Sequence, residues 1–363
     1  MTALASCRFD VINALDLQPK DRAAWENILC SRDDLASPFY HPEFTRALAE
    51  TRGRIEVAVF RKDADAVGFF PFHRTRENTA DALAGRLTEF QGAIVRPDVA
   101  WDPSSLLRCI GLRAWHFDHL PVSQTSFEPY IWRKAPAVFM DLSQGYDAYR
   151  ETVKKRGSSL SQVERKSRKL AREVGPLRFE FHSTDESAFQ LFLDWKTAQH
   201  KRSGYIPVLH VNWVHSLLNQ LRALPPSGDF CGQFSTLYSG DQLVAVHMGL
   251  RSPEALHIWF PTYSVEFEKY SPGLILLLEM ARAAAAAGQR RIDFGRTGER
   301  YKANFQTGEI YTAEGAVDLR PITGPMRKQW FKAKRWIRSS PCRGVLEKPL
   351  NASRKLRQRI AFR

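Results

Sequence analysis

The sequence lacks the short motifs that mark the common hydrolases, metalloenzymes and nucleotide-binding proteins. Its 363 residues contain no G-x-S-x-G, no H-E-x-x-H and no phosphate-binding loop of the G-x-x-x-x-G-K type. The five cysteines are widely spaced and form no C-x-x-C pair, so we expect reduced, mostly structural thiols. His116 and His119 would point to opposite faces of one strand, which argues against a metal pair. We therefore expect no metal cofactor.

Long hydrophobic runs are also missing. The longest aliphatic run, residues 274–278, is far too short to cross a bilayer. Arg8, Asp10 and Asp16 occupy the region in which a signal peptide would need an apolar stretch. We expect a cytoplasmic protein, and the chain is long enough for two globular domains.

Acidic residues are scarce at the C-terminal end. Residues 326–363 contain thirteen Lys or Arg and one acid, Glu347, and so carry +12 of the net charge of +14. The remaining +2 leaves the body near neutral, which argues against a body that binds nucleic acid.

The first part of this tail, residues 326–338, has the pattern of an amphipathic helix. Met326, Trp330, Ala333 and Ile337 fall on one apolar stripe, basic residues occupy the opposite arc, and only Phe331 is out of place. This pattern is typical of helices that lie in a membrane interface. We expect the tail to bind an anionic membrane surface, and cyclic di-GMP is the alternative ligand because guanidinium groups suit its phosphates. A basic tail without a partner is the third possibility.

A strand, helix, strand unit occupies residues 255–294. Residues 255–263 are strand-like, Ser271 and Pro272 favour the start of a long apolar helix that ends near Gly288, and the next strand begins at residue 291. Gly273 allows a ligand to approach backbone N–H groups that lack a partner within the helix. This order predicts an anion site of the kind that binds a pyrophosphate.

Glycine and proline divide the rest of the chain into two α/β domains and the tail. We expect an N-terminal domain over residues 1–145, a second domain over residues 146–320, and the basic amphipathic tail over residues 321–363. A basic helical pattern, interrupted near Gly157, introduces the second domain.

Several segments together resemble a known family. YSPGLILLLEMARAAAAAG followed by IDFGRTGERYK, with SPFYHPEF, GFFPF and WKTAQHKRSG before them, is similar in order and spacing to the CelD-like (BcsL) branch of the GNAT acyltransferases. The resemblance implies an α/β (α+β) fold with tandem GNAT-type domains, each a mixed, mostly antiparallel sheet flanked by helices. It also implies a non-catalytic N-terminal domain, acetyl-CoA as the acyl donor, and a role in bacterial exopolysaccharide synthesis, cellulose included.

The resemblance places the donor site at the start of the long helix. Gly273 takes the position of the first glycine in the GNAT pyrophosphate loop. The other residues that we expect to bind the donor are Tyr270, Ser271, Leu274 and Arg296. The loop departs from the family pattern at Tyr270, where Gln or Arg is usual, and at Ile275, where a small residue is usual.

The segment that follows the second strand carries the candidate catalytic residues. Transfer of an acyl group from a thioester to an amine needs a base for the amine and an acid for the leaving thiolate. Tyr301 is the candidate acid, because a phenol with a pKa of about 10 matches a thiol. Asp293 could take a proton or orient Lys302, and Glu299 is a second candidate base. Arg296 and Lys302 could neutralise developing negative charge.

His247 is a further candidate base. The alternation of residues 243–250 puts it beside small residues on one face of a strand. A buried histidine with no catalytic role is the alternative.

The candidate acceptor site lies in the segment WKTAQHKRSG. On a helix, Trp195, Gln199 and Arg202 share one face and present an aromatic ring, an amide and a guanidinium, with Lys196 beside them. This combination suits a sugar with an anionic group. A partly exposed helix with an anchoring tryptophan is the alternative.

Together these expectations favour an acyl-CoA-dependent N-acetyltransferase that acts on an amino sugar of an exopolysaccharide or its precursor. Two alternatives stay open. One is a Fem-like peptidyltransferase that uses aminoacyl-tRNA, and the other is a non-catalytic scaffold of a polysaccharide synthesis complex that binds a membrane or a second messenger.

Overall fold

The computed structural model describes residues 7–296 and 298–339, and the chain divides into two compact units. The first unit comprises residues 1–24, 53–134 and 313–363, and the second comprises residues 25–52 and 135–312. This division differs from the contiguous domains that we expected with boundaries after residues 145 and 320. The reason is packing between distant parts of the chain, since α2 (Pro42–Arg52) packs on α7 (Asn212–Ala223) and Phe39 contacts the ring of His257.

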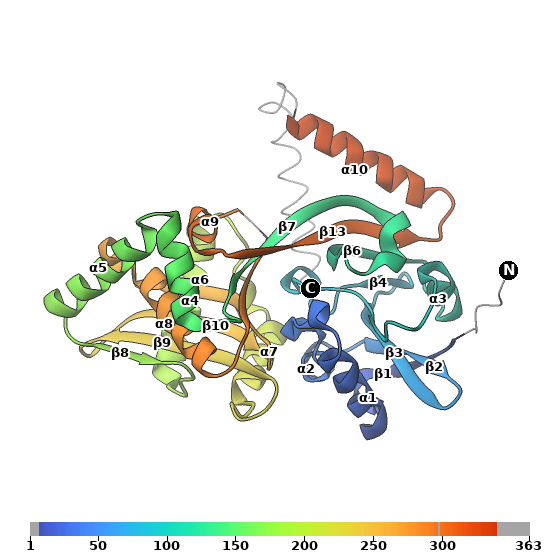
Figure 1. Ribbon diagram of the computed structural model, residues 1–363. Coiled ribbons are helices and arrows are strands. Elements are labelled where there is room, and N and C mark those ends of the chain that lie inside the picture. Colours follow the sequence, from blue (N-terminus) through green and yellow to red (C-terminus); the bar gives the residue numbers. More distant parts are fainter. Residues whose placement is uncertain (1–6, 297, 340–363) are drawn as a thin grey trace. The chain divides into compact units, whose positions relative to one another are not determined.

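The first unit is a mixed sheet with an aromatic core. Its elements are β1 (Arg8–Asn13), the start of α1 (Pro19–Cys30), β2 (Ile55–Lys62), β3 (Asp65–Arg74), β4 (Thr79–Asp81), β5 (Ile94–Val95), α3 (Pro103–Cys109), β6 (Ala114–Pro121), the start of β7 (Ile131–Asp141), the end of β13 (Gly308–Asp318) and α10 (Thr323–Ser339). The strand order is β1-β2-β3-β4-β6-β13 (Figure 1). The short β5 pairs with β3. Phe70 and Phe127 pack on the ring of Trp115 with centroids 5.0 Å away in each case.

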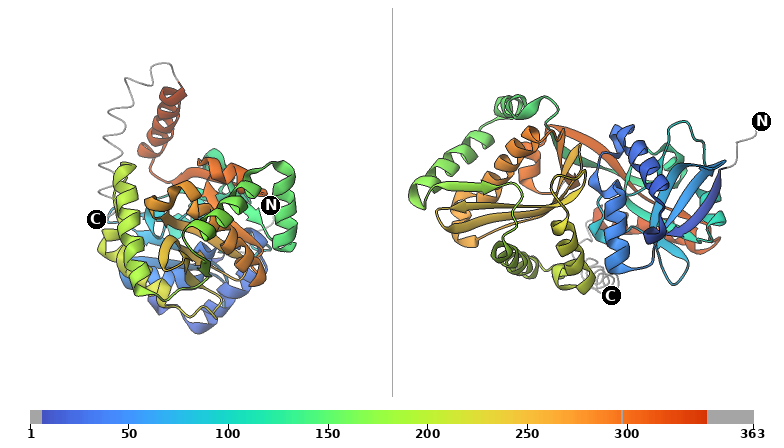
Figure 2. Two further views of the ribbon diagram at one scale, coloured as in Figure 1. Left: turned by 90° about the vertical axis from the view of Figure 1, so that its left-hand side faces the viewer. Right: turned by 90° about the horizontal axis from the view of Figure 1, so that it is seen from below.

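The second unit contains the candidate functional segments. Besides α2, α7 and the remainders of α1, β7 and β13, its elements are α4 (Gly145–Arg156), α5 (Ser159–Glu173), β8 (Leu177–Glu180), α6 (Glu186–Arg202), β9 (Cys231–Ser239), β10 (Gln242–Arg251), β11 (Ala255–Tyr263), α8 (Pro272–Ala286), β12 (Arg291–Arg296) and α9 (Arg300–Phe305). The strand order is β7-β12-β11-β10-β9-β8. Helices α4, α5 and α8 cover one face of this sheet, and α6 and α7 lie on the other face (Figure 2).

Both units repeat one arrangement of strands and helix. In the first unit, antiparallel strands β1 to β4 are followed by α3 and by β6, which is parallel to β4. In the second unit, antiparallel strands β8 to β11 are followed by α8 and by β12, which is parallel to β11. The expected tandem architecture of mixed, mostly antiparallel sheets flanked by helices is therefore confirmed.

Local signals in the second unit correspond closely to the structure. The strand predicted over residues 255–263 is β11, and the predicted apolar helix is α8, after which Gly288 adopts a positive φ of 88°. A left-handed residue suits glycine and ends a helix. The predicted basic helix is divided at Gly157 into α4 and α5.

The amphipathic helix predicted for the tail is α10. Residues 340–363, which carry the rest of the predicted basic tail, lie outside the described residues. No helix among the described residues is long and apolar enough to span a membrane.

Candidate active site

β11 and β12 diverge shortly after they begin. They pair in parallel only where residues 255–257 lie opposite residues 291–293. β11 continues to Tyr263. Within the part of the chain that the structure describes, β11 does not pair with β12 beyond His257.

A β-bulge lies at the point of divergence. β10 pairs Met248 with Phe260 and Leu250 with His257, so β11 has one more residue than β10 between these pairs. The backbone N–H of Trp259, inside the bulge, donates to Nε2 of His247 at 3.4 Å. A bulge bends its strand and increases the local twist, which explains why β11 leaves β12 here.

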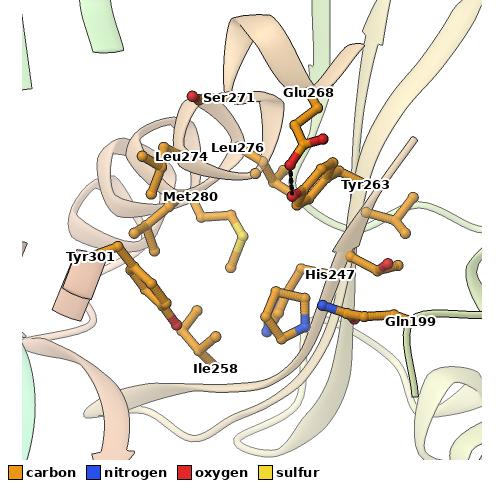
Figure 3. A pocket seen from close by; sticks show the side chains of 15 residues that line it. Gln199, His247, Ile258, Tyr263, Glu268, Ser271, Leu274, Leu276, Met280 and Tyr301 are labelled. Atoms are coloured by element: carbon orange, nitrogen blue, oxygen red, sulfur yellow. Dashed lines mark hydrogen bonds between the residues drawn. The ribbon is translucent and has the colours of Figure 1, made fainter. Parts of the chain in front are cut away.

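A cavity of about 330 Å³ lies beside the diverging strands. This volume is within the range usual for small-molecule sites, which begins at about 300 Å³. Figure 3 shows α8 on one side, with Tyr301 and Gln199 facing each other across His247 and Ile258. The lining residues are Gln199, Val246, His247, Ile258, Pro261, Thr262, Tyr263, Glu268, Ser271, Gly273, Leu274, Leu276, Leu277, Met280 and Tyr301.

The start of α8 forms one end of this cavity. Ser271 has a left-handed backbone with φ of 56°, and its carbonyl accepts from the N–H groups of Leu274 and Ile275 at 3.0 and 3.2 Å. The side-chain cap expected from Ser271 is not formed, because its Oγ instead accepts from Nζ of Lys166 at 2.8 Å. Ser271, Gly273 and Leu274 all line the cavity, as a donor site at this helix start requires.

Three ammonium groups gather around this helix start. Lys166 comes from α5, while Nζ of Lys269 and Nζ of Lys169 lie 4.8 and 6.0 Å from the centre of the Tyr270 ring. Their charge adds to the positive end of the helix dipole. Lys166 was not among the predicted donor residues, because its contact with Ser271 joins residues 105 positions apart.

Tyr270 and Arg296, expected to bind the donor, do not line the cavity. Tyr270 is buried, and its hydroxyl donates to Glu173 at 2.8 Å. This bond holds the pKa of Glu173 below its usual range. Nε of Arg296 donates to Oγ1 of Thr312 at 3.0 Å. Both residues have structural partners, so the donor would meet neither side chain directly.

Tyr301 reaches the cavity from α9. Its ring packs edge-on against Phe294 of β12, with centroids 5.9 Å apart. Figure 3 shows the hydroxyl turned toward the space beside Ile258. The structure therefore places the candidate acid where a ligand between β11 and α8 would meet it.

His247 lines the cavity but does not suit the role of general base. Its side chain is buried, and burial together with the nearby His257 and Lys196 lowers its pKa to about 3. A base works best with a pKa near the working pH. Because Nε2 accepts from Trp259, the proton of the neutral ring belongs on Nδ1, for which no partner is found within the described residues. We therefore assign His247 as a neutral residue of the cavity wall.

The imidazole of His247 fits because residue 249 is glycine. A Cβ on Gly249 would lie 2.3 Å from Cε1 of His247 and 2.3 Å from the carbonyl oxygen of His257. We expect Gly249→Ala to lower the free energy of unfolding by about 1–3 kcal/mol, the cost typical of overpacking. Denaturant unfolding measures it, with Gly228→Ala as the control, because a Cβ on Gly228 would meet nothing closer than 3.4 Å. Equal stability of the two variants would contradict this packing.

A polar pair lies near the donor end of the cavity. Tyr263 donates its hydroxyl to Glu268 at 3.4 Å (Figure 3). Burial and the Glu268 carboxylate raise the pKa of Tyr263. Neither residue was singled out from the sequence, because Tyr263 is one of many strand aromatics and Glu268 lies in a short 3-10 helix without a motif.

The predicted acceptor residues separate in the structure. Of Trp195, Lys196, Gln199 and Arg202, only Gln199 lines the cavity. Trp195 is half-buried and Arg202 is exposed. Lys196 is buried and donates to the carbonyl oxygen of Pro261 at 2.9 Å. Burial lowers the pKa of Lys196 to about 8, although Glu299 acts in the opposite direction.

The predicted partnership of Asp293 with Lys302 is wrong. Nζ of Lys302 instead contacts Glu299 and the carbonyl oxygen of Arg296, each at 2.9 Å. Asp293 is buried beside Arg291, whose Nε lies 3.1 Å from its Oδ1. Neither Asp293, Glu299 nor Lys302 lines the cavity. The physical reason is strand alternation, since Ile292 and Phe294 pack in the core with α8 and Asp293 therefore points to the other face.

The described residues contain no group of three or more His, Cys, Asp or Glu side chains that could hold a metal ion.

A comparison with known protein families matches the part of the chain that forms the cavity. The sequence profile of the family described as "Acetyltransferase (GNAT) domain" matches residues 157–303, which include α5, α8, β12 and Tyr301. No curated protein gives a significant match to the sequence. The profile therefore identifies residues 157–303 as a GNAT-superfamily acetyltransferase domain, and the protein is an acyltransferase.

Solved structures show the same fold at low sequence identity. FemX is similar with a TM-score of 0.54 and 10% identity, over 81% of this chain and 98% of that chain. The C-terminal domain of a protein assigned as a lysylphosphatidylglycerol synthetase from Agrobacterium fabrum has a TM-score of 0.51 and 13% identity, over 87% and 96%. Both likenesses extend over most of the chain and support the tandem fold.

Proposed function

We propose that the protein transfers an acetyl group from acetyl-CoA to the amine of an amino sugar in a bacterial exopolysaccharide or its precursor. One observation carries the proposal. A single cavity begins at the positively charged start of α8, at Gly273, and extends along the diverging β11 to Tyr301. The acceptor class rests on the resemblance to the CelD-like branch.

In this proposal, the pyrophosphate of the donor binds at one end of the cavity and its thioester lies at the other. The pyrophosphate binds at Gly273 with Lys166 beside it, because a helix start and an ammonium group both attract an anion. The pantetheine chain then follows the apolar wall that Ile258, Leu277 and Met280 contribute. This direction brings the thioester to Tyr301.

The proposed reaction is a direct transfer. The neutral amine attacks the thioester carbonyl carbon, the carbon–sulfur bond breaks, and the leaving sulfur takes the phenolic proton of Tyr301. The proton lost by the amine passes to water and Tyr301 is reprotonated from solvent. Gln199 lies across the cavity from Tyr301 and supplies an amide to orient the acceptor and the acetyl oxygen, and the neutral ring of His247 forms the wall beside it.

One observation favours a second candidate, a Fem-like transferase that uses aminoacyl-tRNA. α5, whose Lys166 reaches the cavity end, also exposes Arg165, Arg168, Lys169 and Arg172. Such a basic helix suits a polyanionic donor larger than CoA.

The experiment compares the two donors on the purified full-length protein. Acetyl-CoA is supplied with glucosamine, and aminoacyl-tRNA is supplied in a parallel reaction. We expect release of the CoA thiol and an N-acetylated sugar, detected by mass spectrometry. N-acetylglucosamine, in which the amine is already blocked, is the matched control acceptor and should release no thiol.

The other possible outcomes of this experiment distinguish between the candidate donors and acceptors. Transfer from aminoacyl-tRNA without transfer from acetyl-CoA supports the second candidate. Acetylation of the blocked sugar shows transfer to oxygen. Binding of acetyl-CoA without turnover on amino sugars or their nucleotide-linked forms contradicts the proposed acceptor class.

A further inference from the structure

α10 presents an apolar face to solvent. Met326 and Trp330 on the helix, and Ile322 immediately before it, have exposed fractions of 65%, 51% and 70%. They are spaced four residues apart, so they follow one face of the helix. Ala333, the next member of the predicted stripe, is also exposed.

A face of α10 other than the exposed apolar one contacts the first unit. Phe331 packs on Trp132, with ring centroids 5.4 Å apart, and Arg327 hydrogen-bonds to the ring of His116. At about 100° per residue, Phe331 lies about 100° around the helix from Trp330. Phe331 was the one apolar residue that did not fit the stripe, and in the structure it packs on Trp132 of the same unit. The stripe is therefore left exposed by the same contacts that hold the helix.

Charge narrows the kind of partner that suits this face. The sequence of α10 contains six Lys or Arg and no acid, and residues 326–363 contain thirteen bases and one acid. A purely apolar partner would cover the stripe but leave this charge uncompensated. An anionic lipid surface offers acyl chains for the stripe and headgroup phosphates for the cations, and tryptophan favours that boundary.

We propose that α10 is an interfacial helix that binds the protein to an anionic lipid surface through Met326, Trp330 and the neighbouring basic residues. The proposal is independent of the proposed reaction. Phe331 and Arg327 keep the helix attached to the first unit, while the stripe enters the boundary between headgroups and acyl chains.

The test is cosedimentation of the full-length protein with vesicles. Phosphatidylcholine vesicles containing phosphatidylglycerol should bind the protein at low salt, vesicles of phosphatidylcholine alone should bind it far less, and added salt should release it. The double variant Met326→Ser/Trp330→Ser should bind the anionic vesicles at least about tenfold more weakly, because both side chains lose apolar burial.

The matched control is Leu15→Ser/Leu191→Ser, which removes two apolar side chains that are 51% and 40% exposed elsewhere. This control should bind as the unsubstituted protein does. Equal binding by the stripe variant and the control would overturn the proposal. So would a dimer that the stripe variant abolishes in the absence of lipid, since the stripe would then join two copies of the chain. Binding of cyclic di-GMP by a protein that ignores anionic vesicles would also overturn it.

Discussion

Gly273→Glu should abolish measurable binding of acetyl-CoA while the protein remains folded. Its carboxylate would stand at the start of α8, where we place the pyrophosphate. Two unit charges about 4 Å apart repel by about 4 kcal/mol at the effective dielectric constant of a protein surface, so a loss of at least about 100-fold in affinity is expected. Isothermal calorimetry measures this change.

Stability separates a binding effect from unfolding in this variant. A carboxylate in the first turn of a helix interacts favourably with the helix dipole. A Cβ on Gly273 would lie 3.3 Å from Cδ1 of Tyr263, a close contact that the half-buried Tyr263 ring can relieve by shifting a few tenths of an ångström. The thermal midpoint should therefore change little.

Two further variants calibrate the result. Gly228→Glu places the same side chain at an exposed glycine outside the cavity and should leave affinity unchanged. Lys166→Ala should weaken binding by about tenfold, because it removes one charged hydrogen-bonding group but introduces no repulsion. Unchanged affinity in Gly273→Glu would show that the donor does not bind at this helix start.

Local sequence signals predicted the elements that frame the cavity. The bounds of β11, the start of α8 and its end before Gly288 depend on a strand-like run, on proline and on glycine, all of which act over a few residues. Six of the predicted site residues line the cavity. Ser271, Gly273 and Leu274 lie at the start of α8, and the other three lie on further elements: Gln199 on α6, His247 on β10 and Tyr301 on α9.

The position of Asp293 could also have been predicted from the sequence. The alternation of Ile292, Asp293 and Phe294 already implies that the carboxylate faces away from the two apolar side chains. The motif instead suggested a catalytic group because it lies close to Tyr301 in sequence. Between neighbouring residues of a strand, alternation predicts the direction of a side chain better than closeness to a motif does.

Other features depend on contacts between distant residues. The hydrogen bond of Lys166 to Ser271 needs α5 to pass the start of α8, and no local pattern encodes that. Residues 25–52 likewise join the second unit because α2 packs on α7 and His41 stacks on Phe230 with centroids 4.9 Å apart. The low pKa of His247 depends on burial that several elements produce together.

Tyr301→Phe should lower kcat by at least about 100-fold and change the KM for acetyl-CoA little. The substitution removes the proposed proton donor, and general acid catalysis typically contributes about 100-fold or more. It keeps the ring that packs against Phe294, so the cavity wall should remain in place. Steady-state kinetics on a working amine acceptor measures both constants. Tyr311→Phe, at a 47% exposed tyrosine outside the cavity, is the control and should be as active as the unsubstituted enzyme.

A change of leaving group distinguishes an acid from a purely structural tyrosine. In the acetyl thioester of 4-nitrothiophenol, the leaving group is 4-nitrothiophenolate. This thiolate needs no protonation to leave, because its conjugate acid is much stronger than the thiol of CoA. The deficit of Tyr301→Phe should therefore shrink several-fold with this donor, since only the protonation of sulfur has been lost. A deficit of the same size with both thioesters would assign Tyr301 to positioning. Wild-type kcat in Tyr301→Phe would place the acid elsewhere in the cavity.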